Sequence, residues 1–240
     1  MKKILFTGLA VLLLLSGCGV QESSPAPATA VATTAPVAGN AVTQTVEGRP
    51  AKLVNIETLS QLPELPTGCE VTSLAAVLNY YGFTIDKCDI ADRYLDKGEV
   101  GTVDFHEAFE GDPRDEDAYG CYAPVIVNAA NRILSEYGTS MRAVEVSGNE
   151  LEELFTYLDH DTPVIIWGTL DCAPSEPTTS WVVDGKELQW IYPEHCMVLA
   201  GYSDAAVWVC DPMSGSMQEY EKELFKTGYE ALFRQAIVLQ

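Results

Sequence analysis

The chain has 240 residues, with 14 Lys and Arg residues against 35 Asp and Glu residues, which gives a formal net charge of −21. A surface this acidic repels a phosphate backbone, so nucleic acid is not an expected partner. Hydrophobic residues make up 47% of the chain, which is enough for one domain with a sizeable core.

The first 18 residues have the features of a bacterial secretory signal. Two lysines precede an apolar run that is too short to span a bilayer comfortably. The run ends at Leu15-Ser16-Gly17-Cys18, which resembles the lipobox, a signal whose cysteine is diacylated and becomes the first mature residue. Two acyl chains give stable anchoring. We therefore predict a lipoprotein held by Cys18 on the extracytoplasmic face of the cell membrane; a plain signal peptide with a chance cysteine is the alternative.

Residues 19–46 differ from the rest of the chain in composition. They are mostly Ala, Pro, Thr and Val, with almost no charge and no large aromatic residue. Such a segment cannot bury enough surface to offset the entropy lost on ordering, which predicts a flexible tether. Residues 47–240 are then predicted to form one domain.

Helical patterns dominate the first part of this domain. Three helices are predicted, over residues 70–81, 123–138 and 149–161. Gly82 ends the first, while Pro124 in the first turn and Gly138 as a stop bound the second. Residues 84–120 begin with a short helical pattern and then turn acidic and glycine-rich, which predicts a long surface excursion.

The spacing of apolar residues changes in the second part of the domain. Short β-branched or aromatic runs bounded by turn residues predict strands over residues 163–170, 187–192, 195–203, 205–211 and 234–239. A further short helix is predicted near Glu219–Phe225. Because helices come first and an antiparallel sheet second, the fold class is α+β rather than an alternating βαβ arrangement.

Six cysteines follow Cys18 in the chain: Cys69, Cys88, Cys121, Cys172, Cys196 and Cys210. An even number of cysteines outside the cytoplasm often indicates disulfides, but the spacing is irregular and a domain of this size needs no cross-links. The pairing therefore stays open. Three scattered histidines and no paired cysteine spacing match no recognisable metal site, so neither a metal nor another cofactor is expected.

Cys69 is the candidate nucleophile because it precedes the first predicted helix, and a helix N-terminus favours a thiolate. Ordinary packing is the alternative for a cysteine at this place. His195 is the candidate base, since it opens an apolar strand that could hold an imidazole. His160 lies in a charged turn, and His106 lies in the acidic excursion with no strand or helix to fix it.

Asp211 ends the next strand, sixteen residues beyond His195. A carboxylate there could accept the second imidazole N–H and fix the tautomer. A two-residue turn at Asp204-Ala205 would point Asp211 to the opposite face of the sheet, whereas a bulge would return it to the face of His195. Spacing alone leaves both arrangements open.

Six segments in order carry a family resemblance: QLPELPTGCEVTSLAAVLNYYGF, FEGDP with GCYAPVI, TPVIIWGTL, EHCMVLAGYSD, VCDPMSG and RQAIVL. They resemble the peptidase C39-like family of exported bacterial proteins, a papain-like cysteine-peptidase group. The resemblance covers nearly the whole domain. It implies a papain-like fold in which an N-terminal helical part, with the nucleophile helix, packs on an antiparallel β-sheet.

The resemblance implies a role for each candidate residue. Cys69 would be the nucleophile, His195 the general base and acid, and Asp211 the residue that orients His195. Gln61 would be the oxyanion-hole side chain, together with the backbone N–H of Cys69. Gln61 lies eight residues before Cys69, where related enzymes usually have about six. Glu70 is expected to cap the helix and face away from the thiol.

The expected function is that of an extracytoplasmic thiol hydrolase that cleaves a peptide or amide bond through a Cys-His-Asp triad. Its partners would be a peptide or cell-wall amide substrate and, through the lipid anchor, the membrane. The alternatives are a cell-wall amidase or acyl transferase with the same triad, or a catalytically silent surface-binding lipoprotein. The sequence does not fix the substrate preference or the oligomeric state.

Overall fold

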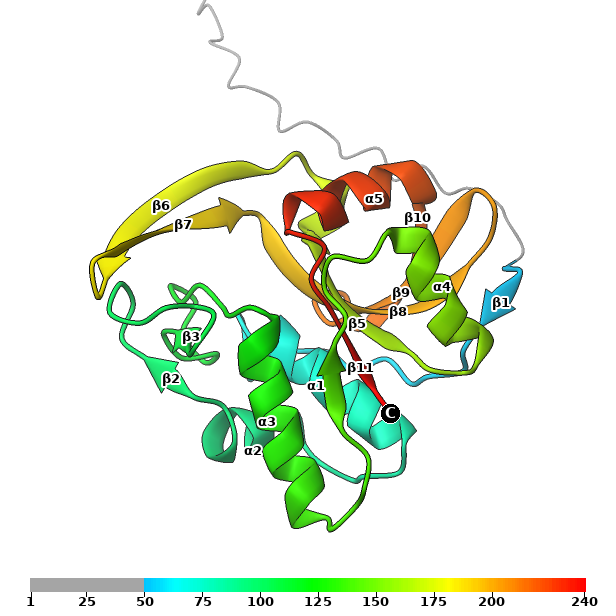
Figure 1. The fold of residues 1–240 in the computed structure, drawn as a ribbon, viewed down its shortest axis with the longest axis horizontal. Coiled ribbons are helices and arrows are strands. Elements are labelled where there is room, and N and C mark those ends of the chain that lie inside the picture. The colour runs from blue at the N-terminus through cyan, green and yellow to red at the C-terminus, as the bar shows by residue number, and fades with distance from the viewer. Residues whose placement is uncertain (1–49) are drawn as a thin grey trace, which may run out of the picture. The chain divides into compact units, whose positions relative to one another are not determined.

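The structure is a computed structural model that describes residues 50–240 (Figure 1). The predicted signal peptide, the lipid attachment at Cys18, the tether and the first residues of the predicted domain lie outside the described residues. Among the helices of residues 50–240, none is both long and apolar enough to cross a membrane.

A seven-stranded antiparallel sheet forms the centre of the domain, with strand order β10-β9-β8-β5-β11-β4 and with β1 paired to the end of β8. Its strands are β1 (Lys52–Leu53), β4 (Ala143–Glu145), β5 (Val164–Thr169), β8 (Glu194–Tyr202), β9 (Ala206–Asp211), β10 (Ser216–Glu221) and β11 (Ala236–Leu239). The central strands β5, β9 and β11 are buried along their whole length.

Helices cover both faces of this sheet (Figure 1). They are α1 (Cys69–Tyr80), α2 (Lys87–Arg93), α3 (Ala123–Glu136), α4 (Leu151–Asp159) and α5 (Lys222–Ala231). The apolar faces of α1 and α3 share one hydrophobic cluster with the sheet, and those of α4 and α5 share a second cluster on the other face. The predicted α+β fold, with N-terminal helices packed on an antiparallel sheet, is confirmed.

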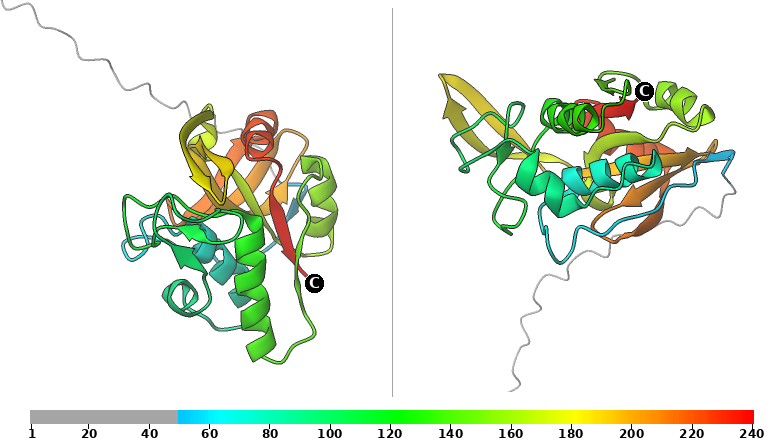
Figure 2. Two further views of the ribbon diagram at one scale, coloured as in Figure 1. Left: turned by 60° about the vertical axis from the view of Figure 1, so that its left-hand side comes forward. Right: turned by 90° about the horizontal axis from the view of Figure 1, so that it is seen from below.

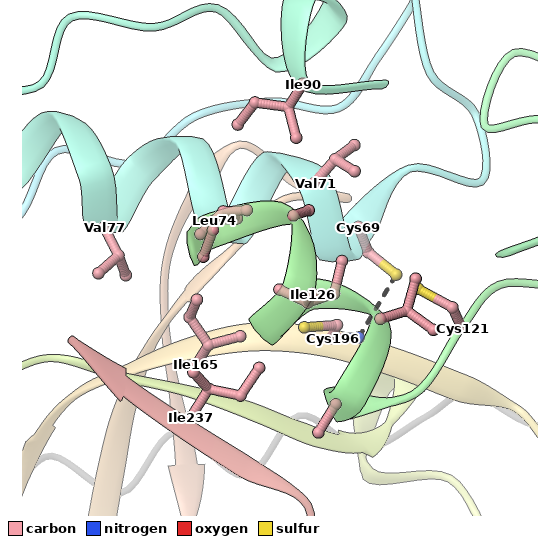
Figure 3. Close-up of a cluster of buried hydrophobic side chains, with 14 of the residues drawn as sticks. Cys69, Val71, Leu74, Val77, Ile90, Cys121, Ile126, Ile165, Cys196 and Ile237 are labelled. Carbon is pink, nitrogen blue, oxygen red and sulfur yellow. Dashed lines mark hydrogen bonds between the residues drawn. The ribbon is translucent and has the colours of Figure 1, made fainter. Parts of the chain in front are cut away.

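Helix α1 forms because its apolar side chains meet partners from three other elements. Figure 3 shows Leu74 and Val77 directed toward Ile165 of β5 and Ile237 of β11, with Ile126 of α3 beside them. All residues of α1 from 69 to 78 are buried. This packing, rather than a side-chain cap, stabilises the start of the helix, since no side chain caps its N-terminus.

The other predicted helices also form, with recognisable terminal residues. Pro124 lies in the first turn of α3. Helix α4 has a reciprocal capping box between Glu150 and Glu153, and Asp86 caps α2 by accepting from the N–H of Cys88 at 2.7 Å.

Two predictions along the chain are wrong in part. The helix predicted near residues 219–225 begins only at Lys222, because residues 216–221 form β10 at the sheet edge, where polar side chains face solvent. The acidic excursion is not wholly on the surface: Phe105, Phe109 and Glu110 are buried. The ring of Phe105 packs edge-to-face on Trp190, which explains why this segment is held against the domain.

A hairpin that the sequence predicted only in part extends from the sheet, as both views of Figure 2 show. It consists of β6 (Glu176–Val183) and β7 (Lys186–Tyr192). The predicted strand 187–192 corresponds to β7. Strand β6 lacks an apolar alternation because its residues 176–180 are exposed, which explains why the sequence did not predict it. The remaining pair, β2 (Lys97–Gly98) and β3 (Phe109–Glu110), is short and parallel.

Candidate active site

Cys69 is the first residue of α1, where the sequence placed the nucleophile, and it is 6% exposed. Its thiol donates a hydrogen bond to Oε2 of Glu70 (3.3 Å). The same sulfur accepts a hydrogen bond from the backbone N–H of Cys196 in β8 (3.4 Å), drawn as the dashed line in Figure 3. The thiol is therefore buried in the hydrophobic cluster around α1 and is hydrogen-bonded there to two polar groups.

Glu70 does not cap the helix or face away, so that prediction is wrong. The residue is fully buried, and its Oε1 accepts a hydrogen bond from the N–H of Cys121 (2.7 Å). Gly120 makes room for it: a Cβ built there would lie 2.6 Å from Oε1 of Glu70. The carboxylate turns inward because a backbone donor from the segment before α3 replaces the helix-end donors that a cap would satisfy.

The surroundings of the thiol oppose its ionisation. Burial, followed by the nearby carboxylates of Glu70 and Glu194, raises the pKa of Cys69 well above its ordinary value. Burial also raises the pKa of Glu70 to about 7, and burial together with Glu70 raises that of Glu194. The thiolate expected at a helix N-terminus is therefore disfavoured in this conformation, which holds Cys69 as a neutral thiol.

His195 and Asp211 lie in contact. Nε2 of His195 is 2.6 Å from Oδ1 of Asp211, and both residues are buried. The register between β8 and β9 shifts between Leu199 and Gly201, and this irregularity puts the two side chains on the same face of the sheet. Of the two arrangements left open by the sequence, the structure has the one with a bulge.

Asp211 is held as a carboxylate by several donors. Its oxygens accept from the backbone N–H groups of Met213 (2.9 Å) and Ser214 (3.2 Å). Burial alone would raise the pKa of Asp211, but the hydrogen bond and charge of His195, with these other donors, hold the pKa below its ordinary value. The imidazole must then donate from Nε2, which leaves Nδ1 as its acceptor nitrogen when the ring is neutral.

The segment before α1 brings Gln61 beside the end of β9. The backbone N–H of Gln61 donates to the carbonyl oxygen of Pro212 (2.8 Å), and a turn returns the chain through Leu65, whose N–H donates to the carbonyl of Gln61 (2.9 Å). The side-chain Nε2 donates to the carbonyl of Pro66 (2.7 Å). Within residues 50–240, Oε1 of Gln61 has no hydrogen-bond partner. Its oxyanion role stays a prediction.

The thiol and the imidazole have different hydrogen-bond partners. No hydrogen bond within the described part of the chain joins Sγ of Cys69 to the ring of His195. The sulfur contacts the N–H of Cys196, the residue after His195. Successive side chains of a strand point to opposite faces, and Cys196 packs in the cluster around α1. The structure thus joins His195 to Asp211 but does not bring the thiol to the imidazole, because the sulfur contacts the backbone of Cys196, whose side chain points to the face opposite to that of His195.

The other two histidines lie in other surroundings. His160 is exposed at the end of α4, in the charged turn that the sequence indicates. His106, for which the sequence offered no fixed position, has its Nδ1 2.7 Å from Oδ1 of Asp104. Lys186 of β7 also contacts Asp104 (2.7 Å), so this carboxylate links the hairpin to the excursion.

The six cysteines of the described region are all free thiols. Two other neighbours of Cys69 were not predicted from the sequence as site residues. They are Glu70, which was expected to face away, and Glu194. Oε1 of Glu194 is sealed from solvent and has no hydrogen-bond partner among residues 50–240. The sequence signal was a glutamate adjoining each of the two candidate residues, Cys69 and His195.

Comparisons with known proteins agree with this architecture. The model of the Peptidase_C39 like family matches residues 53–237. The chain is 26% identical over 188 residues to the uncharacterized protein YvpB of Bacillus subtilis (strain 168), covering 74% of this chain and 71% of that protein. It is also similar to the solved structure of a putative C39-like peptidase from Bacillus anthracis, with 30% identity, a TM-score of 0.71, and coverage of 80% of this chain and 98% of that one. The chain therefore belongs to the Peptidase_C39 like family.

Proposed function

We propose that this protein is a thiol hydrolase that cleaves a peptide or other amide bond, with Cys69 as nucleophile, His195 as general base and acid, and Asp211 as the residue that orients His195. One observation carries the proposal: His195 and Asp211 are 2.6 Å apart, while the sulfur of Cys69 is bonded to the peptide N–H adjoining His195. Because Nε2 is engaged by Asp211, Nδ1 is the atom that would take the thiol proton.

In the proposed reaction the sulfur of Cys69 leaves Glu70 and meets Nδ1 of His195. This requires the N-terminus of α1 and the start of β8 to shift, because the side chains of His195 and Cys196 point to opposite faces of the strand and Cys196 is the one packed around α1. The thiolate attacks the substrate carbonyl carbon, and the imidazolium is stabilised by Asp211. The imidazolium then protonates the leaving amine, and water, deprotonated by His195, hydrolyses the acyl-enzyme. The N–H of Cys69 and the amide of Gln61, released from Pro66, would hold the oxyanion, a contribution of about 10²–10³ in rate.

A peptide is the first substrate class to test, because the similar Bacillus anthracis protein is described as a putative C39-like peptidase. A cell-wall amide would suit the same triad, in hydrolysis or in acyl transfer. The lipobox at Cys18 supports an extracytoplasmic, lipid-anchored location, where both substrate classes occur.

A second function, binding without turnover, is favoured by one observation. Cys69 is 6% exposed and His195 is 3% exposed, so a substrate carbonyl reaches neither side chain unless the surrounding structure moves. A silent binding protein needs no such movement.

Zymography on casein and on peptidoglycan separates these functions. We expect turnover of at least one of them by the full chain, loss of that activity in C69A, and a fall of about 10²–10⁴ in D211N because the imidazole loses its orienting carboxylate. C210A, which removes a buried thiol in β9, is the matched control and should stay active. Activity that survives C69A would contradict the mechanism, and inactivity on both substrates would favour the binding function.

A further inference from the structure

We propose that Cys69, Glu70 and Glu194 form a binding site for a divalent cation of the Zn²⁺ type, which holds the candidate nucleophile in an inactive position. The sulfur of Cys69 and one carboxylate oxygen from each glutamate all lie within 4.8 Å of one another. Ligand atoms around one tetrahedral Zn²⁺ are about 3.5 Å apart, given Zn–S of about 2.3 Å and Zn–O of about 2.1 Å. Small side-chain rotations would therefore suffice to form the site.

The charges of the cluster favour a cation. Glu70 is fully buried, and Glu194 is half-buried, with its Oε1 sealed from solvent. Among residues 50–240, no Lys, Arg or His lies within ion-pair distance of either carboxylate. Burying an ionised carboxylate without a partner is costly, so two adjacent ones need either protons or a metal ion. A divalent cation satisfies both carboxylates and the thiolate together.

The unpartnered oxygen of Glu194 is the second observation that points to a ligand. Glu70 uses Oε1 on the N–H of Cys121 and Oε2 on the thiol, but Oε1 of Glu194 accepts no hydrogen bond in the described chain. Both carboxylates converge on Gly120, where a built Cβ would lie 2.6 Å from Oε1 of Glu70 and 3.3 Å from Oε2 of Glu194. A glycine there leaves space in which the two carboxylates can approach a common ion.

The donor set also selects the kind of ion. One thiolate with two carboxylates suits Zn²⁺ or Co²⁺, whereas Ca²⁺ and Mg²⁺ prefer oxygen ligands alone. On binding, the S–H bond of Cys69 breaks, its proton and any protons on the two carboxyl groups leave to solvent, and metal–sulfur and metal–oxygen bonds form, with no change in oxidation state. A sulfur bound to the ion cannot reach His195, so the ion would block the proposed hydrolase reversibly.

Cobalt spectroscopy tests the site without relying on catalysis. The full chain, treated with chelator, is titrated with Co²⁺ and then with Zn²⁺. We expect one ion per chain, with thiolate-to-cobalt charge-transfer absorption that Zn²⁺ displaces. C69S should abolish this absorption, and E194Q should weaken binding at least about tenfold, as loss of a ligand must cost no less than loss of a supporting residue. E110Q, which alters another fully buried carboxylate, should leave both the absorption and the affinity for Co²⁺ unchanged.

Thermal unfolding of each variant shows whether it is folded, and E194Q keeps the shape of the side chain. The absence of charge-transfer absorption in folded wild-type chain, an equal absorption in C69S, or an equal affinity for Co²⁺ in E194Q would overturn the proposal. The first result would mean that the carboxylates hold protons only. The outcome is separable from the proposed function: an inactive protein with the absorption supports the metal site, and an active one without it supports the hydrolase alone.

Discussion

Two effects act in opposite directions on the sulfur of Cys69. A helix N-terminus stabilises a negative charge by about 0.3–1 kcal/mol, and by about 2 kcal/mol in favourable partly buried positions. Full burial alone can shift a pKa by several units, each worth about 1.4 kcal/mol, and here Glu70 and Glu194 add to it. Burial therefore prevails, and the pKa of the thiol rises. In the proposed mechanism the inward position would be a resting state, and attack on a carbonyl would require the sulfur to leave it.

The pocket for Glu70 depends on the missing side chain of Gly120, which gives a prediction at the residue scale. G120A should lower the free energy of unfolding by about 1–3 kcal/mol more than G138A, measured by urea denaturation. Both glycines have positive φ (150° and 67°), so both substitutions strain the backbone. Only at Gly120 does the Cβ also clash, whereas Gly138 has nothing within 4 Å. Equal losses of unfolding free energy in G120A and G138A would mean that the Glu70 side chain can move aside without a cost in stability.

The identities of the candidate residues could be read from sequence, but the surroundings of the thiol could not. Cys69 at a helix start and His195 at a strand start follow from local pattern. The donors around the sulfur come from segments far along the chain, at Cys121 and Cys196. Rules of metal-ligand spacing look for paired Cys and His, so they pass over a site that includes Glu194.

At the scale of elements, the register of β8 and β9 decides whether His195 meets Asp211. A regular two-residue hairpin would separate them, and the irregularity between Leu199 and Gly201 joins them. Gly201 was the available signal, since a glycine within a strand often marks a bulge or a close backbone approach. A Cβ there would lie 2.9 Å from the carbonyl oxygen of Lys52, so the glycine also admits β1.

Elements with strong periodicity were predictable, and those stabilised by distant partners were not. The stripe of α1 and the apolar run of β5 depend on local pattern. Strand β10 has mostly polar residues, and β6 is largely exposed, so neither shows the alternation that predicts a half-buried strand. The burial of Phe105 in the acidic excursion depends on distant aromatic partners, Tyr122, Trp181 and Trp190, the last 85 residues later in the chain.

Asp104 joins the β6–β7 hairpin to the excursion, which gives a prediction at this scale. Burial would raise the pKa of Asp104, but the bonds from Lys186 and His106 lower it from 3.8 to about 2. The folded state thus binds the proton more weakly than the unfolded state. The stabilisation is fully present above the unfolded pKa near 4 and is lost as the pH falls through about 2.

D104N should therefore lower the free energy of unfolding by about 1–2 kcal/mol at pH 6, and the difference from wild type should shrink between pH 4 and pH 2. Urea denaturation at each pH measures this difference. D204N, in an exposed turn, is the control and should change stability by less than about 0.5 kcal/mol. A difference that stays constant over this pH range would show that the ion pair does not stabilise the fold.

At the scale of the whole domain, the two halves of the candidate site come from different elements. Helix α1 presents Cys69 from one face, while β8 and β9 supply His195 and Asp211. The fold class and the order of these elements were predictable, because each half follows from its own local pattern. The burial of Cys69 and His195 could not be predicted, because it depends on how segments distant in the chain pack together.

The alkylation rate of Cys69 tests most directly whether the thiol works with His195. Iodoacetamide labelling of the full chain is followed by mass spectrometry over a range of pH, with Cys88, a half-buried thiol, as internal reference. The account predicts pH-dependent labelling of Cys69 that slows at least about tenfold in H195A, while Cys88 labels unchanged. Labelling of Cys69 at the rate of an ordinary thiol, equal in wild type and H195A, would contradict it.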